Sequence, residues 1–424
     1  MLPSGSRYLI EAPEHWNGIV LLFRHPVPVE RDEPPWDDDP FVDHLVGLGY
    51  AVAGSANTIF WPLELAFSDH PALVEVVARV LGPARHTIAV GQSIGGLITA
   101  GLVQRFSDSL SGGLALCGNM AGAVGTHNRE LDIVFVVKTL IAPGSALQLT
   151  GISDPHANLR LSRLVLQEAQ GTPSGRARLA LAAAVGNVPG WHDPTSEEPP
   201  PEDLPGRQQN QHAWFREICF LVFFWAREQV ERQAGGNPSW NTDVDYRGLL
   251  ATSFNRDVAE GLYASAGLDL DQDLERLSGE DRIAADPSAL EYLQRHIVLS
   301  GDLGGVPVMT VHTDGDGLVT PDHQHAYADV VGAAGQGEQL RQLFIHRAGH
   351  CTMTFAEVVT ALEALIERIE SGAWPHLDAE ALNDASGSRG ANANVLVSGQ
   401  PAAARFFEFK PPPFPRSYDI RDIG

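Results

Sequence analysis

A serine lies at the centre of a G-x-S-x-G pentapeptide, residues 91–95, between two apolar runs at 86–90 and 97–103. This setting predicts a buried strand, a tight turn and a helix, with the hydroxyl of Ser93 exposed as a nucleophile. Ile94 begins the helix, where amides have no partner and the helix dipole favours a negative charge. We therefore expect a nucleophile and one oxyanion-hole donor. A turn whose serine only caps the helix is the alternative.

Partners for this serine follow later in the chain. Residues 306–312 and 340–346 are apolar runs typical of buried strands. Asp314 and Asp316 lie in the turn after the first run, and His350 follows the second. A serine hydroxyl needs an imidazole to take its proton, and the imidazole needs a carboxylate to hold its tautomer. We predict His350 as the general base and Asp316 as its orienting acid, with Asp314 as the competing acid.

The order Ser, Asp, His, each after its own strand, resembles that of the α/β-hydrolase superfamily, most of all bacterial esterase-type serine hydrolases with a large inserted cap. The resemblance implies an α/β fold with a mostly parallel central sheet flanked by helices. It also implies a mainly helical cap inserted after the sixth strand, and acyl transfer to water as the chemistry. The segments that carry the resemblance are 18–26, 49–55, 91–106, 312–321 and 347–357.

The second oxyanion donor is where the chain departs from this superfamily. The strand ending near residue 25 usually finishes there in His-Gly, whereas His25 is followed here by Pro26. Proline has no N–H, so we predict the N–H of Val27 as the donor that acts with that of Ile94. A reshaped hole, with slow hydrolysis or another reaction, is the alternative, since loss of one donor typically costs about two to three decades in rate.

The resemblance and the helical periodicity divide the chain. Residues 1–125 and 300–371 are expected to form the hydrolase core, and residues 126–299 a helical cap over the site. Residues 372–424 are expected to be a C-terminal extension that packs on the core or on a neighbouring subunit. The cap is rich in aromatic residues, which favours a substrate with an apolar part; a homodimer contact is the alternative. Six side chains are expected to line the pocket, with core packing as the alternative for the second and third: His25, Phe60, Trp61, Asn119, Trp214 and Phe224.

Composition limits the partners of the 424-residue chain. Its formal net charge of −24 argues against a nucleic-acid partner, because phosphate contacts need clustered Lys and Arg. It has no uninterrupted apolar stretch of roughly 18 residues, so no membrane span is expected. The acidic runs lack the spaced glycine and terminal glutamate of a calcium loop. The sequence therefore predicts a small-molecule substrate, with no metal and no cofactor.

The three cysteines, Cys117, Cys219 and Cys351, are far apart and have no C-x-x-C spacing. They predict no disulfide framework and neither zinc nor redox chemistry. Cys351 is expected to pack beneath the loop that carries His350. The first residues lack the basic and apolar regions of a signal peptide, so a cytoplasmic protein is expected, with a removed upstream leader as the alternative.

Together these residues predict a serine hydrolase that acts on a carboxylic ester, lactone or thioester through an acyl-enzyme intermediate. An acyltransferase or a C–C-bond hydrolase that uses the same three residues is one alternative. A hydrolase-fold protein that only binds its ligand, or converts it without hydrolysis, is the other.

Overall fold

The short apolar runs of the sequence form one central sheet in the computed structural model, which describes residues 1–24, 33–56 and 61–418. In these ranges the sheet has eight strands in the order β1-β3-β2-β4-β5-β6-β7-β8. The strands from β3 to β7 run parallel, and β1 and β8 pair antiparallel at the two edges. The strands are β1 (Tyr8–Glu11), β2 (Ile19–Arg24), β3 (Ala51–Ser55), β4 (His86–Gln92), β5 (Gly112–Leu116), β6 (Val308–Gly315), β7 (Leu340–Ala348) and β8 (Phe406–Phe407).

Both faces of the sheet are buried, because side chains alternate between the faces along each strand. On β2, Val20 and Leu22 belong to the apolar cluster that includes α2 (Leu63–Leu81) and α3 (Ile94–Phe106). Leu21 and Phe23 belong to the cluster that includes α1 (Pro40–Gly47) and α14 (Phe355–Ser371). Helices on both faces of a mostly parallel sheet define an α/β fold, as the sequence predicts.

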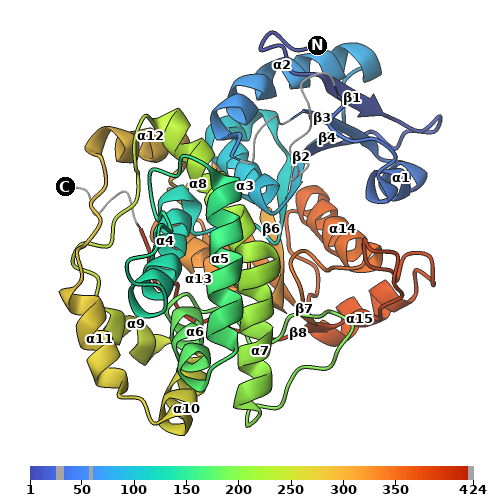
Figure 1. The fold of residues 1–424 in the computed structure, drawn as a ribbon. Helices are drawn as coiled ribbons and strands as arrows, with labels where there is room; N and C mark the ends of the chain where they lie inside the picture. The colour runs from blue at the N-terminus through green and yellow to red at the C-terminus, as the bar shows by residue number, and fades with distance from the viewer. Residues whose placement is uncertain (25–32, 57–60, 419–424) are drawn as a thin grey trace.

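Between β5 and β6 the described chain forms helices and no strand, and in Figure 1 these green and yellow helices gather beside the sheet. They enclose an apolar cluster of their own, to which the Ala- and Leu-rich α6 contributes side chains buried on all sides. Five strands precede this insertion in the described chain, so the expected position after the sixth strand is wrong by one. The helices are α4 (Gly122–Leu140), α5 (Pro155–Gln170), α6 (Pro173–Val185), α7 (Leu204–Trp214), α8 (Phe220–Ala234), α9 (Tyr246–Thr252), α10 (Arg256–Ala266), α11 (Leu270–Gly279) and α12 (Pro287–Ile297).

After β6 the chain forms α13 (Asp322–Ala333), the neighbouring strand β7 and then α14. It then forms α15 (Ala379–Gly387) and the edge strand β8. The buried Arg347 side chain donates to Glu357 on α14 and to the carbonyl of Ala403, which fastens the C-terminal segment to the core. The boundaries predicted for core, cap and extension stay predictions. None of the helices in the described ranges is long and apolar enough to cross a membrane.

Candidate active site

Ser93 occupies the turn between β4 and α3, with a φ of 56° that places it in the left-handed region. The turn is tight because backbone lies against backbone on both sides of it. A Cβ on Gly91 would lie 2.2 Å from the carbonyl oxygen of Gly95, and a Cβ on Gly95 would lie 2.2 Å from that of Arg24. The predicted strand, turn and helix are thus present, and glycine is required at both positions.

His350 joins the serine to a carboxylate. Its Nε2 lies 2.8 Å from Ser93 Oγ, and its Nδ1 lies 2.7 Å from Asp316 Oδ2. The Asp316 side chain is fully buried, whereas that of His350 is 14% exposed. Residues from the ends of β4, β6 and β7 therefore meet at the carboxyl edge of the sheet, in the arrangement expected from the sequence.

The acid is held by its own turn. Asp316 Oδ1 accepts hydrogen bonds from the backbone N–H groups of Leu318 and Val319, each at 3.0 Å. Its other oxygen is left to face the imidazole of His350. A carboxylate fixed in this way selects the tautomer in which Nδ1 carries the proton and Nε2 is free to accept one.

Asp314, the competing acid, forms a hydrogen bond with a different imidazole, that of His346. Asp314 Oδ2 lies 2.7 Å from His346 Nδ1, and Asp314 Oδ1 accepts from the backbone N–H of Arg347 at 3.0 Å. The hydrogen bond to Asp314 raises the pKa of His346 above its ordinary value. The geometry thus pairs His350 with Asp316 and leaves Asp314 to a second Asp–His pair.

A further histidine, His312, supports the acid turn and was not singled out in the sequence. Its fully buried imidazole lies with Nε2 2.7 Å from the carbonyl of Val319 and 3.7 Å from Asp316 Oδ2, while Nδ1 lies 3.0 Å from Gln324 Nε2. Burial lowers the pKa of His312 and favours the neutral ring, which donates from Nε2 to the carbonyl. The only sequence signal was its place at the end of a predicted strand, which does not separate it from a core residue.

The loop of His350 is tied to two strands. Thr313 Oγ1 donates to the carbonyl of Gly349 at 2.8 Å, and this links the loop to β6. A disulfide joins Cys351 to Cys117, which directly follows β5, across 234 residues of sequence. The prediction that the cysteines are unpaired is therefore wrong for these two, and Cys219 alone is free and buried. Sequence spacing could not reveal the pair, because only the parallel arrangement of β5, β6 and β7 brings the two residues together.

Of the residues predicted to form the oxyanion hole and the pocket, some lie in the described structure and others lie outside it. Ile94 is the first residue of α3, so its N–H has no carbonyl one turn earlier in that helix. Trp61 is buried, with its ring centroid 4.5 Å from that of His127, and Asn119 is buried just beyond the end of β5. The other predicted residues of the site, Val27, His25 and Phe60, lie outside the described residues.

The two predicted pocket residues that belong to the helical insertion, Trp214 and Phe224, are buried against other side chains. Trp214 lies so close to Gly317 that a Cβ there would be 2.4 Å from the indole, and its Nε1 donates to the carbonyl of Trp191 at 2.8 Å. Phe224 is buried in the apolar cluster of the helical insertion, beside Phe220. Trp214 thus supports the acid turn from outside, and a pocket role for either residue stays a prediction.

The topology decides the fold. A serine in a tight turn after β4, an aspartate after β6 and a histidine after β7, on a mostly parallel sheet, agree with the resemblance seen in the sequence. The chain has an α/β-hydrolase fold. Comparison with known proteins found no family profile that matches this chain. One curated relative, o-phthalyl amidase from Xanthobacter agilis, is 28% identical over 415 residues, which cover 90% of this chain and 89% of that protein.

Solved structures similar to this chain are distant in sequence. Feruloyl esterase B from Aspergillus oryzae matches with a TM-score of 0.40 and 14% identity, over 87% of this chain and 79% of that one. Lipase A from Candida antarctica, in its closed state, matches with a TM-score of 0.43 and 10% identity, over 94% and 86% of the two chains. Tannin acyl hydrolase from Aspergillus niger matches with a TM-score of 0.43 and 12% identity, over 87% and 76%.

Proposed function

We propose that this α/β-hydrolase cleaves a carboxylic ester by acyl transfer to Ser93 and then to water. The observation that carries the proposal is the short path Ser93 Oγ to His350 Nε2 to Asp316, with contacts of 2.8 and 2.7 Å. Serine hydroxyls become nucleophilic when an oriented imidazole can accept their proton. Each of these groups has the partner that this chemistry requires.

The proposed reaction has two halves. Ser93 Oγ attacks the carbonyl carbon while its proton passes to His350 Nε2, and Asp316 stabilises the imidazolium. The oxyanion accepts from the N–H of Ile94 and, as the sequence predicts, from that of Val27. His350 then gives its proton to the leaving group, which departs and leaves an acyl-enzyme. Water attacks the ester of Ser93 with His350 as base, and the acid product and free Ser93 result.

Amide hydrolysis is the second candidate for the same residues. The o-phthalyl amidase relative, similar along 90% of the chain, favours an amide of an aromatic acyl group. The two candidates differ in the leaving group, since an amine must be protonated as it leaves, whereas an alkoxide or phenoxide leaves more readily. A matched ester and amide of one acyl group therefore separate them by kcat/KM.

The acyl part of the substrate is proposed to lie between the ends of β3 and β5. Trp61 follows β3 and Asn119 follows β5, on either side of the strand that carries the nucleophile. Ligands of open α/β sheets bind outside the carboxyl ends of the strands. This position favours Trp61 as an apolar wall and Asn119 as a polar group near the acyl chain. A lactone or thioester would fit the same chemistry.

Labelling with a fluorophosphonate tests the proposal. We expect one adduct, on Ser93, that is absent in Ser93→Ala and in His350→Ala. The matched control is Ser109→Ala, a half-buried serine in the short helical turn that follows α3, which should keep the adduct. A folded protein whose Ser93 stays unlabelled would overturn hydrolysis and favour a protein that only binds its ligand. Nitrophenyl esters of rising chain length then test the apolar part, and a preference for acetate would count against it.

The location and assembly are further proposals. A cytoplasmic location was expected from the first residues, but disulfides persist mainly in oxidising compartments. The Cys117–Cys351 bond therefore favours an exported protein. A homodimer stays a prediction, which the mass of the protein in solution tests.

A further inference from the structure

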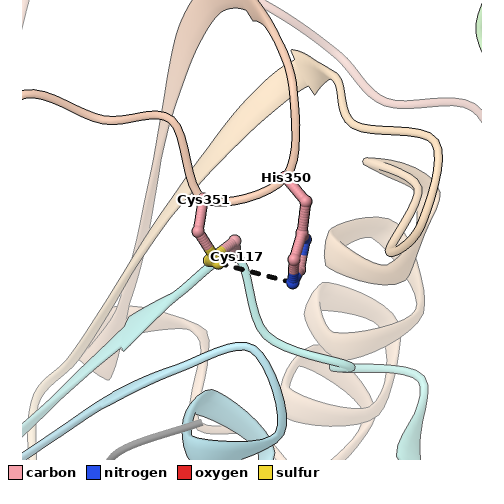
Figure 2. Close-up of side chains that lie close together, drawn as sticks. All are labelled: Cys117, His350 and Cys351. Carbon is pink, nitrogen blue, oxygen red and sulfur yellow. Dashed lines mark hydrogen bonds between the residues drawn. A yellow bond between two sulfur atoms is a disulfide. The ribbon is translucent and has the colours of Figure 1, made fainter. Parts of the chain in front are cut away.

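Two sulfur atoms and one imidazole nitrogen meet beside the nucleophile. In the part of the chain that the structure describes, the donor atoms of Cys117, His350 and Cys351 all lie within 4.8 Å of one another. Figure 2 shows the three side chains converging from the end of β5 and from the loop after β7. Two thiolates and an imidazole are a ligand set that zinc prefers in proteins.

The spacing of these atoms suits one metal ion. Cys351 Sγ lies 3.5 Å from His350 Nε2. Zn–S and Zn–N bonds of about 2.3 and 2.0 Å at a tetrahedral angle place sulfur and nitrogen roughly 3.5 Å apart. The two sulfurs are bonded to each other in this structure and would have to separate to about 3.8 Å. Cys351 lies in a loop rather than in a strand, so this separation moves a loop and not the sheet.

We propose that reduction of the Cys117–Cys351 disulfide creates a Zn²⁺ site with His350, and that zinc bound there withdraws the imidazole from Ser93. In the reduction a dithiol supplies two electrons and two protons, the S–S bond breaks, two S–H bonds form, and the reductant leaves as a disulfide. Zinc binding then releases the two thiol protons. The inhibitory consequence rests on the proposed hydrolytic function, whereas the metal site does not.

The nitrogen that binds zinc is the nitrogen that serves the nucleophile. His350 Nε2 lies 2.8 Å from Ser93 Oγ, so it cannot hold a metal and accept the serine proton together. The disulfide therefore keeps this nitrogen free for catalysis. In a reducing, zinc-containing cytosol the two reduced cysteines and His350 bind zinc, and the site is inactive. Oxidation of the cysteines after export then activates it.

The third cysteine does not compete for the metal. Cys219 is fully buried, and its Sγ lies 3.5 Å from the carbonyl of Gly317. Burial raises the pKa of this thiol and keeps it protonated. Cys219 is thus the matched control for the two cysteines of the site.

Zinc binding is measured first in the full-length Ser93→Ala variant, so that the readout does not depend on hydrolysis. A phosphine reductant is used because, unlike a dithiol, it does not chelate zinc strongly; water converts it to the phosphine oxide as the disulfide becomes two thiols. We expect one Zn²⁺ per reduced chain and none per oxidised chain. Cobalt in place of zinc should give thiolate charge-transfer and tetrahedral absorption bands.

The variants assign the ligands. Replacing both Cys117 and Cys351 by Ser should abolish binding, His350→Gln should weaken it roughly tenfold or more, and Cys219→Ala should leave it unchanged. Binding that survives the double serine variant, or no binding to the reduced chain, overturns the metal site. Circular dichroism of each variant shows whether a loss of binding comes from unfolding.

The inhibition is tested separately in the wild-type protein. Reduced enzyme with a chelator should stay active, lose activity at least tenfold when zinc is added, and recover with excess chelator or on oxidation. Zinc bound without loss of activity would overturn the inhibitory role. Zinc bound by the Ser93→Ala variant, together with no labelling of Ser93 in the wild type, would overturn hydrolysis and leave the metal site standing.

Discussion

Asp316 lies 2.7 Å from the imidazole of His350, whereas Asp314, two residues earlier, lies 2.7 Å from the imidazole of His346. The register between β6 and β7 shifts between Thr313 and Gly315, where one residue of β6, Asp314, stands opposite two of β7, His346 and Arg347. Such an irregularity redirects side chains at the end of a strand. Two Asp–His pairs thus stand side by side, and one of them faces Ser93.

The two acids are therefore expected to respond differently to the same substitution. Asp316→Asn should lower kcat by about a thousandfold to ten-thousandfold, because an amide no longer selects the required tautomer of His350. Asp314→Asn should change kcat only a few-fold, since it acts on His346. Steady-state kinetics on one ester compares them, and similar losses in both variants would contradict the assignment of the acid.

The pair of His346 and Asp314 should stabilise the folded protein more at low pH than at high pH. The pKa of His346 is raised, first by its hydrogen bond to Asp314, so its protonated form is favoured in the folded protein. The contribution of this protonated form to the free energy of unfolding is fully present below the pKa of His346 in the unfolded chain, about 6.5. It is lost as the pH rises through the pKa of His346 in the folded protein. His346→Gln should therefore reduce the free energy of unfolding more at about pH 5.5 than at about pH 9. Urea unfolding of both proteins checks this, and an equal difference at both pH values would refute it.

The buried His70 should have the opposite effect and lower the free energy of unfolding as the pH falls. Burial lowers the pKa of His70 to about 3, and its Nε2 lies 3.0 Å from Ser109 Oγ. The folded protein keeps this ring neutral while the unfolded chain takes up a proton near pH 6.5. The contribution is thus present above about pH 6.5 and is lost as the pH falls toward 3, by up to about 1.4 kcal/mol per pH unit. His70→Asn should show a shallower loss of stability between pH 6.5 and 5, and parallel curves would contradict it.

The nucleophile turn should not tolerate a single added methyl group. Gly95→Ala would place a Cβ 2.2 Å from the carbonyl oxygen of Arg24, so strand and helix must separate. We expect a loss of about 3 kcal/mol in the free energy of unfolding and a loss of labelling at Ser93. Gly332→Ala is the control, because nothing lies within 4 Å of its Cβ position in α13, and it should be neutral or stabilising by about 0.5–1 kcal/mol. Equal stability of the two variants would show that the turn has room.

Local pattern in the sequence was enough to predict the strand, turn and helix around Ser93, and the strands that precede Asp316 and His350. These features depend on neighbouring residues: small ones at 91 and 95, and apolar runs that can be buried on both faces of a sheet. The fold class followed from their order. The strand count before the insertion was wrong by one, because it was taken from the resemblance to the superfamily and not from the apolar runs of this chain.

Only the tertiary structure decided which groups face one another. The choice of Asp316 over Asp314 depends on the β6–β7 register, and the support from His312 depends on how the acid turn folds back. The Cys117–Cys351 bond spans 234 residues and needs the ends of β5 and β7 to lie close together. Pairing between distant residues carries no local signal, because it arises from the order of strands in the sheet. The sequence thus predicted which groups are proposed to react, and the packing of the sheet decided which side chains they face.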